Sequence, residues 1–250
     1  MLTEERHQHI LERLEENDIV TINDLMTPLE ASESTIRRDL QNLENQGLLV
    51  RIHGGAKKLQ RLNFEAPMSE KAEKFHLEKK QIAKKAAHLI TKENVIYLDA
   101  GTTTLAMIPY ISTQDNIQVV TNSVKHATLL VERNIKTIIL GGSIKLSTHA
   151  ALGSFTIKQL EQFRFDQAFL GMNGAHLKAG FTTPDPEEAA IKKLAMSQSQ
   201  QNYVVMDHSK FQQVTFTHVA PLKTATIITD SLPKDNSRQF QSQTKLMEVK

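Results

Sequence analysis

The chain has 250 residues, of which 40% are hydrophobic and 23% are charged, and it contains no cysteine. This composition predicts a globular protein and excludes a disordered chain, a disulfide framework and a thiolate nucleophile. No apolar run approaches the ~18 residues of a membrane span. The N-terminus is charged from residue 4, and the ten histidines show no metal-binding spacing. We therefore expect a cytoplasmic protein of one large or two unequal domains, with no membrane partner, metal or cofactor.

The charge changes sign within the first sixty residues. Residues 1–36 carry two arginines against nine acidic residues, whereas residues 37–61 carry six basic residues against two acidic ones. Such a change inside a small domain is typical of a face that binds a polyanion. An ordinary solvated surface gives the same balance, and the charge alone does not separate the two interpretations.

The spacing of apolar residues predicts three helices followed by a small hairpin. The expected elements are helices that begin at Thr3, Thr21 and Ser32, a strand over residues 48–52 and a tight turn at Gly54–Gly55. Pro28 ends or kinks the second helix, and Gly47 closes the third. This order of elements is typical of a winged helix-turn-helix.

The third helix carries polar side chains on the face opposite its apolar stripe. A recognition helix inserts its N-terminal residues into the major groove, where arginine reads guanine and hydroxyl groups reach phosphates. We therefore expect the helix and the wing to contact double-stranded DNA through Ser34, Thr35, Arg37, Arg38, Arg51, His53, Lys57 and Lys58. Asp39 is expected to bind an arginine of the same domain instead of a base. An amphipathic surface helix explains the stripe but not the wing that follows.

Residues 59–74 are polar, contain Pro67 and are predicted to link a DNA-binding domain over residues 1–58 to a second domain over residues 75–250. In the second domain, short β-branched strands alternate with helices, which predicts an α/β fold with a Rossmann-like, mostly parallel sheet. Strands are expected near residues 95–98, 117–121, 137–140, 167–170, 203–206 and 225–229, with helices near residues 104–111, 123–134, 154–162 and 186–199. Ligands of such sheets bind beyond the carboxyl ends of the strands.

Glycine or polar residues follow five of these strands. After the first, Gly101 lets the backbone approach a ligand, and Thr102, Thr103 and Thr104 offer hydroxyl groups and helix N-terminal amides to a phosphate. A Gly-Thr turn that merely caps a helix has the same sequence. After the later strands come Asn122, Gly141, Gly142, Asn173, Asp207 and Lys210. Their convergence on one crevice favours a phosphorylated small ligand.

The segment over residues 181–196 places two acidic and two basic residues on one helix. Glu188 and Lys192 are four residues apart. This spacing fits a surface salt bridge as well as polar groups that face sugar hydroxyls. The spacing does not decide between the two.

Two motifs together resemble the N-terminal domain of DeoR-type bacterial transcriptional repressors: SESTIRRDL at residues 32–40 and RIHGGA at residues 51–56. Residues 75–250 resemble the effector domain of that family, which is related in fold to ribose-5-phosphate isomerase, a sugar-phosphate isomerase. The resemblance implies a sugar-phosphate site around Asp99, Gly101, Thr102, Thr103, Thr104, Asn122, Gly141, Gly142, Glu188, Asp207 and Lys210. Residues 1–10, 97–109 and 182–195 look most like fructose-operon repressors, which implies fructose 1-phosphate as the effector.

The competing interpretation is a sugar-phosphate isomerase with an attached DNA-binding domain. Isomerases of this fold use an acid-rich DGADE-like segment after the fourth strand, whereas GMNGAH at residues 171–176 has no carboxylate. Glu188 remains a candidate base, but we expect no catalytic site and no enzyme activity. A repressor that responds to another sugar phosphate and a transcriptional activator are further alternatives. Because helix-turn-helix proteins bind paired half-sites, we expect a homo-oligomer, a dimer or higher.

Overall fold

The computed structural model describes residues 2–17, 19–58 and 62–249. The chain divides into two compact units, Met1–Arg61 and Leu62–Lys250. Within the described ranges, no helix combines the length and the apolar character that crossing a bilayer requires.

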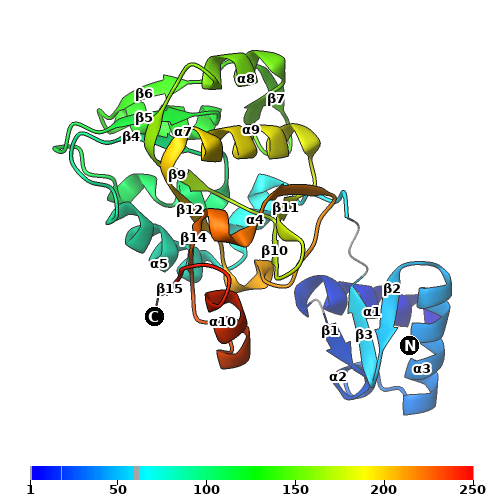
Figure 1. The fold of residues 1–250 in the computed structure, drawn as a ribbon. Coiled ribbons are helices and arrows are strands. Elements are labelled where there is room, and N and C mark those ends of the chain that lie inside the picture. Colours follow the sequence, from blue (N-terminus) through cyan, green and yellow to red (C-terminus); the bar gives the residue numbers. More distant parts are fainter. Residues whose placement is uncertain (1, 18, 59–61, 250) are drawn as a thin grey trace. The chain divides into compact units, whose positions relative to one another are not determined.

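The first unit is a winged helix-turn-helix (Figure 1). Its elements are α1 (Thr3–Asn17), β1 (Ile19–Thr21), α2 (Ile22–Met26), α3 (Glu33–Asn45), β2 (Leu49–Ile52) and β3 (Gly55–Lys58). The strand β3 pairs antiparallel with both β1 and β2, which makes a three-stranded wing. Buried apolar residues from all three helices form one core, among them Ile10, Leu25 and Leu40.

Local capping groups set the ends of these helices. Thr21 and Asp24 form a capping box at the start of α2, and the Ser32 hydroxyl accepts a hydrogen bond from an amide in the first turn of α3. After α3, Gly47 has a φ of 68°, a left-handed conformation that favours glycine. The helix α2 ends before Pro28, as the sequence predicts.

The second unit is an α/β domain built on a seven-stranded sheet. Its helices are α4 (Met68–Glu73), α5 (His76–Ala87), α6 (Thr102–Leu105), α7 (Val124–Glu132), α8 (Ser154–Leu160), α9 (Pro186–Ser197) and α10 (Lys234–Gln241), with 3-10 turns η1 (Ile108–Tyr110), η2 (His208–Lys210) and η3 (Leu222–Thr224). The large sheet contains β4 (Val95–Leu98), β5 (Gln118–Thr121), β6 (Lys136–Ile139), β9 (Phe165–Leu170), β12 (Ser199–Val205), β14 (Thr226–Thr229) and β15 (Leu246–Glu248). Its order is β15-β14-β12-β9-β4-β5-β6, and every neighbouring pair is parallel. The predicted Rossmann-like sheet is confirmed.

Helices cover both faces of this sheet (Figure 1). Successive residues of a strand point to opposite faces. In β4, Ile96 and Leu98 pack with Ile82 of α5, whereas Tyr97 packs with the cluster that contains Ile191 of α9. The strands are therefore buried on both sides, which explains their nearly continuous apolar sequences.

Three further features differ from the expectation. The helix predicted over residues 104–111 is only the single turn α6 followed by η1, because Pro109 lacks the N–H group that a continuous helix needs. A three-stranded antiparallel sheet, not predicted, contains β10 (Gly174–His176), β11 (Gly180–Thr183) and β13 (Thr217–Ala220). A hairpin, also not predicted, contains β7 (Ser143–Lys145) and β8 (Ala150–Leu152). Strands of three or four residues are too short to show a period.

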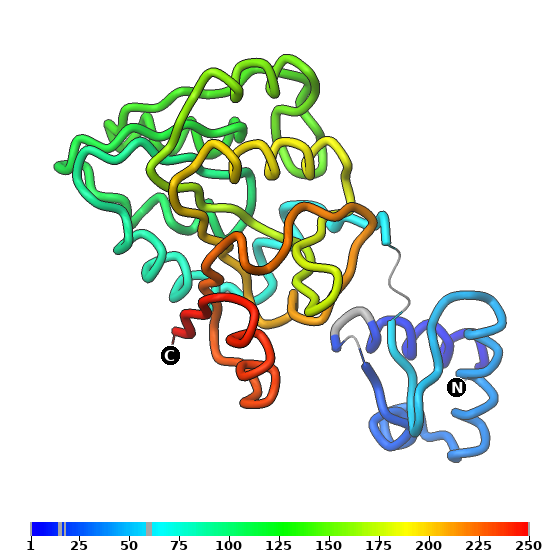
Figure 2. The backbone as a smooth tube through the Cα atoms, viewed as in Figure 1, coloured from blue at the N-terminus to red at the C-terminus, as the bar shows by residue number. Residues whose placement is uncertain are grey.

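The segment predicted as a linker also differs. Residues 59–61 lie outside the described residues, and from residue 62 the chain belongs to the second unit, where Figure 2 traces it in cyan. The carbonyl of Leu62 accepts a hydrogen bond from the amide of Phe216 at 2.9 Å, and the amide of Met68 donates to the carbonyl of Ser147 at 3.0 Å. These partners are distant in sequence, so the local composition could not reveal them.

Candidate functional site

The order of the large sheet reverses between β4 and β9. From β4 the chain builds outward through β5 and β6, then returns to the other side through β9, β12, β14 and β15. In open parallel sheets, ligands bind beyond the carboxyl ends of the strands at this reversal. The loops after the two strands meet there, because the amide of Gly171 donates to Oδ2 of Asp99 at 3.1 Å.

A buried ion pair lies at this point. Nζ of Lys192, on α9, donates to Oδ2 of Asp99, and the two residues are only 4% and 2% exposed. Burial raises the pKa of Asp99, and the charge of Lys192 opposes that rise. Burial lowers the pKa of Lys192, but the carboxylates of Asp99 and Glu188 more than offset this and raise it. Lys192, whose role could not be decided from its spacing to Glu188, therefore lies at the candidate site.

The loop after β4 presents a run of amides without acceptors. In the part of the chain that the structure describes, the amides of residues 101–104 donate to no protein group, as is usual for the first turn of a helix. Gly101 has a φ of −178°, an extended conformation, and a Cβ there would lie 3.1 Å from Oγ1 of Thr104. Thr103 is 7% exposed and Thr102 half-buried. The run can accept the oxygens of a phosphate.

Behind this loop lies His126, which is fully buried. Its Nε2 lies 3.1 Å from Oγ1 of Thr104, and its Nδ1 lies 2.6 Å from Oγ of Ser123. The single hydroxyl proton of Thr104 points to the carbonyl of Asp99 at 2.7 Å, so Nε2 carries a proton and Nδ1 accepts one from Ser123. Burial lowers the pKa of His126 to about 3, so the ring is neutral. The Thr104 hydroxyl predicted to face a phosphate is thus bonded within the protein.

The loops after β5 and β6 also have their polar groups bonded internally. Oδ1 of Asn122 accepts hydrogen bonds from a tyrosine hydroxyl and a backbone amide, both at 3.1 Å. The amide of Gly141 donates to Gln159, and its carbonyl accepts from Thr156. A Cβ on Gly142 would lie 2.2 Å from Oγ1 of Thr156. Asn122 and both glycines therefore shape the edge of the candidate site, and close packing against Thr156 requires a glycine at position 142.

On the other side of Lys192, a second lysine bridges three carboxylates. Nζ of Lys145, at the end of β7, lies 3.0 Å from Oε1 of Glu188, 2.9 Å from Oδ2 of Asp185 and 3.2 Å from Oε2 of Glu65. The hydroxyl of Thr148 also donates to Glu188, at 3.0 Å. Burial lowers the pKa of Lys145, but these carboxylates outweigh burial and raise it.

The carboxylate of Glu65 joins this cluster to Asn173. Oε1 of Glu65 accepts from Nδ2 of Asn173 at 3.1 Å and from Nζ of Lys71, and Thr183 donates to Oδ1 of Asn173 at 2.9 Å. Burial raises the pKa of Glu65, but the charges of Lys71 and Lys145 outweigh it and lower the pKa. Glu65, Lys71 and Lys145 are not among the residues predicted for the site, because no local pattern in the sequence marks them. Asp185 could have been found, since an aspartate before Pro-Glu-Glu is a helix N-cap signal.

Asp207 and Lys210 lie after β12, on the side of the sheet toward β14. Asp207 is buried and accepts hydrogen bonds from the amide and hydroxyl of Ser209. Lys79 of α5 is close enough to interact electrostatically with both, and burial lowers the pKa of Lys79. No hydrogen bond or ion pair among the described residues joins this group to Asp99 or Glu188. The structure therefore brings Asp99, Lys192, Glu188 and Asn173 together and leaves Asp207 and Lys210 beside Lys79.

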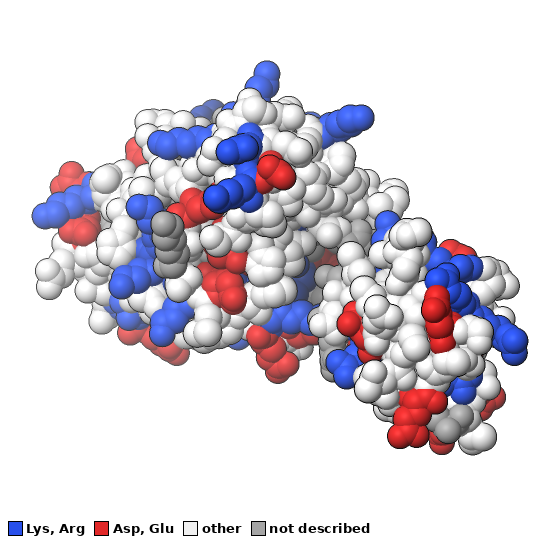
Figure 3. All heavy atoms as spheres, turned by 90° about the horizontal axis from the view of Figure 1, so that it is seen from below, with Lys and Arg blue, Asp and Glu red and all other residues white. Residues whose placement is uncertain are grey.

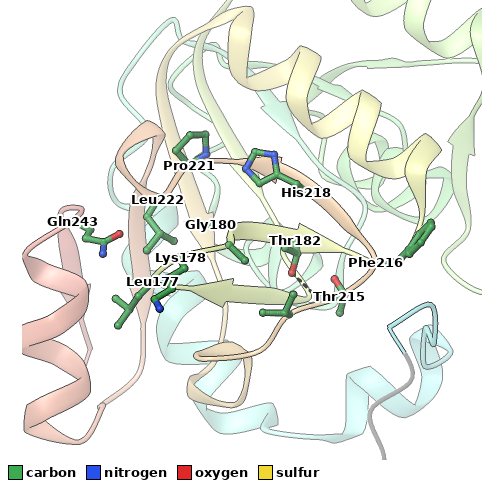
Figure 4. Close-up of a pocket in the computed structure, with 12 residues that line it drawn as sticks. Leu177, Lys178, Gly180, Thr182, Thr215, Phe216, His218, Pro221, Leu222 and Gln243 are labelled. Atoms are coloured by element: carbon green, nitrogen blue, oxygen red, sulfur yellow. Dashed lines mark hydrogen bonds between the residues drawn. The ribbon is translucent and has the colours of Figure 1, made fainter.

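A separate cavity of about 460 Å³ lies against the small antiparallel sheet (Figure 4). Its wall includes Leu177 and Lys178 of the β10–β11 turn, with Phe216 and Leu222 from the later chain. None of the residues expected to bind the effector lines it. Lys178, Thr182, Thr215, His218 and Gln243 supply polar side chains to it, but the buried Asp99–Lys192 pair and the amides of residues 101–104 lie at the reversal of the sheet, which we keep as the candidate ligand site.

The residues expected to read DNA lie on the surface of α3. Ser34 and Arg38 are exposed, and Arg38 has no hydrogen bond or ion pair with any residue that the structure describes. Arg37 is exposed and bonded to Glu33 at 2.6 Å. Thr35 is half-buried, and its hydroxyl lies 2.9 Å from that of Ser32. Of the two arginines expected to read DNA on this helix, Arg38 is the one that is not engaged by a described side chain.

The wing hairpin carries the other expected DNA contacts. His53 and Lys57 are exposed, and Lys58 is half-buried. The guanidinium of Arg51 donates to Oε1 of Gln41 on α3, which ties the wing to the recognition helix. In Figure 3, which shows one face of the molecule, basic and acidic side chains are interspersed over both units.

Two family models match the chain: the DeoR-like helix-turn-helix domain over residues 6–61 and the DeoR C terminal sensor domain over residues 74–231. The "uncharacterized HTH-type transcriptional regulator FruR" of Bacillus subtilis is 46% identical over 250 residues, which is 100% of both chains. The glycerol-3-phosphate regulon repressor of Escherichia coli is 31% identical over 83% of this chain and 82% of its own.

Among solved structures, ribose 5-phosphate isomerase A from Methanocaldococcus jannaschii is 17% identical and covers 53% of each chain, with a TM-score of 0.40. Nothing about function follows from so weak a likeness. The winged helix-turn-helix and the sensor domain together define a DNA-binding transcriptional regulator. The chain belongs to the DeoR family.

Proposed function

We propose that this regulator represses a sugar-utilisation operon, that of fructose, and that a sugar phosphate such as fructose 1-phosphate controls its binding to double-stranded operator DNA. The observation that carries the proposal is the run of free amides over residues 101–104 at the reversal of the sheet, beside the buried Asp99–Lys192 pair. Amides at a helix start bind phosphate oxygens, and carboxylates and lysines suit hydroxyl groups.

The relatives support the same class of effector. One is named for a regulon of glycerol-3-phosphate, a small phosphorylated polyol. The fructose assignment rests on the similarity of residues 1–10, 97–109 and 182–195 to fructose-operon repressors.

The mechanism is a linkage between two sites. If the effector binds more tightly to an arrangement that does not fit the operator, it shifts the population away from the DNA-bound state. A coupling of roughly 1–3 kcal/mol changes DNA affinity about 5–150-fold. We propose that the regulator acts in the cytoplasm as a homo-oligomer, because two recognition helices are needed for paired half-sites.

The test is operator affinity measured with and without fructose 1-phosphate. Thermal unfolding gives a second readout, since a ligand at 100 times its Kd stabilises a protein by about 2.7 kcal/mol. Fructose, glucose 6-phosphate and glycerol 3-phosphate serve as matched ligands. If fructose 1-phosphate neither shifts unfolding nor changes operator affinity, the effector assignment is wrong. If another of these phosphates does so, the effector is a small phosphorylated compound, but it is not fructose 1-phosphate.

We also infer that the sensor unit is not an isomerase. Glu188, the candidate base, accepts hydrogen bonds from Lys145 and Thr148, and the segment over residues 171–176 supplies no other carboxylate. We expect no interconversion of fructose, glucose or ribose phosphates. Turnover that is lost in Glu188→Gln would contradict this inference.

A further inference from the structure

The carboxylate of Glu65 lies inside the cluster next to the candidate effector site. Its side chain is 8% exposed, and it accepts hydrogen bonds from Lys71, Lys145 and Asn173. Along the chain, Glu65 comes only four residues after Arg61, the last residue of the DNA-binding unit. Residues 62–68 lead from the DNA-binding unit into the sensor unit. Through Glu65, this segment occupies three hydrogen-bond donors of the sensor unit.

Without Glu65, this cluster suits the hydroxyl groups of a sugar. Lys71, Lys145 and Asn173 would then have hydrogens to donate, while Asp185 and Glu188 already lie there as acceptors. A sugar hydroxyl both donates and accepts, so a mixed set of this kind binds it well.

The charges of the cluster also favour an anionic ligand in the place of Glu65. With Glu65 in place, three carboxylates face two lysines in this cluster. Without Glu65, two carboxylates face two lysines, and the buried Asp99–Lys192 pair beside them is neutral overall. Glu65 therefore repels an anionic ligand and also occupies the hydrogen-bond donors that the ligand would use. The repulsion is strong where water is largely excluded.

We propose that Glu65 occupies the hydroxyl-binding part of the effector site and that a sugar phosphate displaces it. This inference rests on the proposed function, which it deepens by naming the residue that competes with the effector. The phosphate contacts residues 101–104, and the sugar replaces Glu65 on Lys71, Lys145 and Asn173.

Displacement of Glu65 frees the segment that leads to the DNA-binding unit. Residues 62–68 are held to the sensor unit by two backbone hydrogen bonds, from Phe216 to Leu62 and from Met68 to Ser147, with the Glu65 cluster between them. When Glu65 leaves, the segment loses its hydrogen bonds to Lys145 and Asn173. Effector binding therefore changes how the DNA-binding unit is tethered, which is the two-state element that the linkage requires.

The first experiment compares fructose 1-phosphate binding by the full-length wild type and Glu65→Gln. The glutamine has the same shape but no charge, so it competes less with the effector. We expect the variant to bind at least about fivefold more tightly. The matched control is Glu70→Gln, which removes a partly exposed ion pair with Lys74 and should leave the affinity unchanged. Equal or weaker binding by Glu65→Gln would overturn the proposal.

The second experiment follows amide hydrogen exchange of Met68 and Phe216, whose amides make the two backbone hydrogen bonds that hold the segment. Saturating fructose 1-phosphate should speed exchange there in the wild type, and Glu65→Gln should do so without ligand. Unchanged or slower exchange in the ligand-bound wild type would overturn the proposal, and this readout does not depend on the folding of the variant.

The two proposals fail in different ways. If the wild type binds fructose 1-phosphate and releases operator, while Glu65→Gln binds it more weakly, Glu65 is an effector ligand and only the inference is wrong. If neither protein binds any sugar phosphate, the proposed function is wrong. The inference, which needs a sugar phosphate to displace Glu65, is then wrong as well.

Discussion

Arg6 of α1 donates two hydrogen bonds to the carboxylate of Asp39 in the recognition helix α3, at 2.7 and 3.0 Å. Nε2 of His7 lies 3.1 Å from the same carboxylate, and Asp39 is only 2% exposed. The prediction that Asp39 binds an arginine of its own domain is confirmed. The contact anchors α3 to α1 at the position next to the exposed Arg38.

Asp39→Ala should destabilise the DNA-binding unit by about 1–3 kcal/mol, because it removes the buried carboxylate to which Arg6 donates two hydrogen bonds. Chemical denaturation of the full chain, followed by hydrogen exchange in α3, measures the change. Glu33→Ala removes an exposed ion pair with Arg37 and should cost no more than about 1 kcal/mol. Equal losses in the two variants would show that the buried contact has no special role.

Arg38→Ala should abolish sequence-specific DNA binding and leave the fold intact, because the side chain is exposed and bonded to no described residue. Lys57→Ala should weaken specific and nonspecific DNA alike and flatten the salt dependence, as expected for a phosphate contact. Titrations with operator and random DNA at several salt concentrations separate the two effects. An equal loss for all sequences in Arg38→Ala would contradict base reading.

Gly101→Val should bind operator normally but no longer respond to fructose 1-phosphate. The φ of −178° accepts valine without backbone strain, but its Cβ would lie 3.1 Å from Oγ1 of Thr104, and the side chain crowds the free amides. Thr103→Ala should impair the response less. Loss of one hydrogen bond from its hydroxyl to the phosphate should weaken the free energy of effector binding by about 1.5–3 kcal/mol. Operator affinity with increasing effector checks both. A wild-type response in Gly101→Val would place the phosphate elsewhere.

Lys192→Met should cost about 3–5 kcal/mol of unfolding free energy, because it leaves the buried carboxylate of Asp99 without its counter-charge. Lys193→Met is the matched control, since Lys193 is the next residue of the same helix and is exposed. Thermal unfolding of both variants makes the comparison. Similar stability would mean that the Asp99–Lys192 pair does not form in solution.

The sensor unit should lose stability as the pH falls below about 6.5, the ordinary pKa of histidine. In the folded state His126 has a pKa of about 3, so between these values only the unfolded state takes up this proton. The expected contribution is about 1.4 kcal/mol for each pH unit. His126→Gln should flatten this part of the stability profile, and His218→Gln, at an exposed position, should not. An unchanged slope in His126→Gln would show that another group causes the acid sensitivity.

The elements whose signals are local could be predicted from the amino-acid sequence alone. Thr21 and Ser32 cap helices through their own first turns, and Gly47 takes the left-handed conformation that ends α3. The residues of β4 and the last three residues of β9 form continuous apolar runs because both faces of the sheet are covered. These local patterns were sufficient to predict the winged helix-turn-helix, the parallel sheet and the loops at the carboxyl ends of the strands.

Only the tertiary structure decided which charged residues meet. Lys192 and Lys193 are neighbours with the same chemistry, yet one is buried against Asp99 and the other is exposed, because only one lies on the face of α9 that packs toward the sheet. Glu65 reads as part of a polar linker, but its partner Lys145 is eighty residues away in a three-residue strand. The partner of a buried charge is set by the packing of distant elements, and no local period in the sequence records that packing.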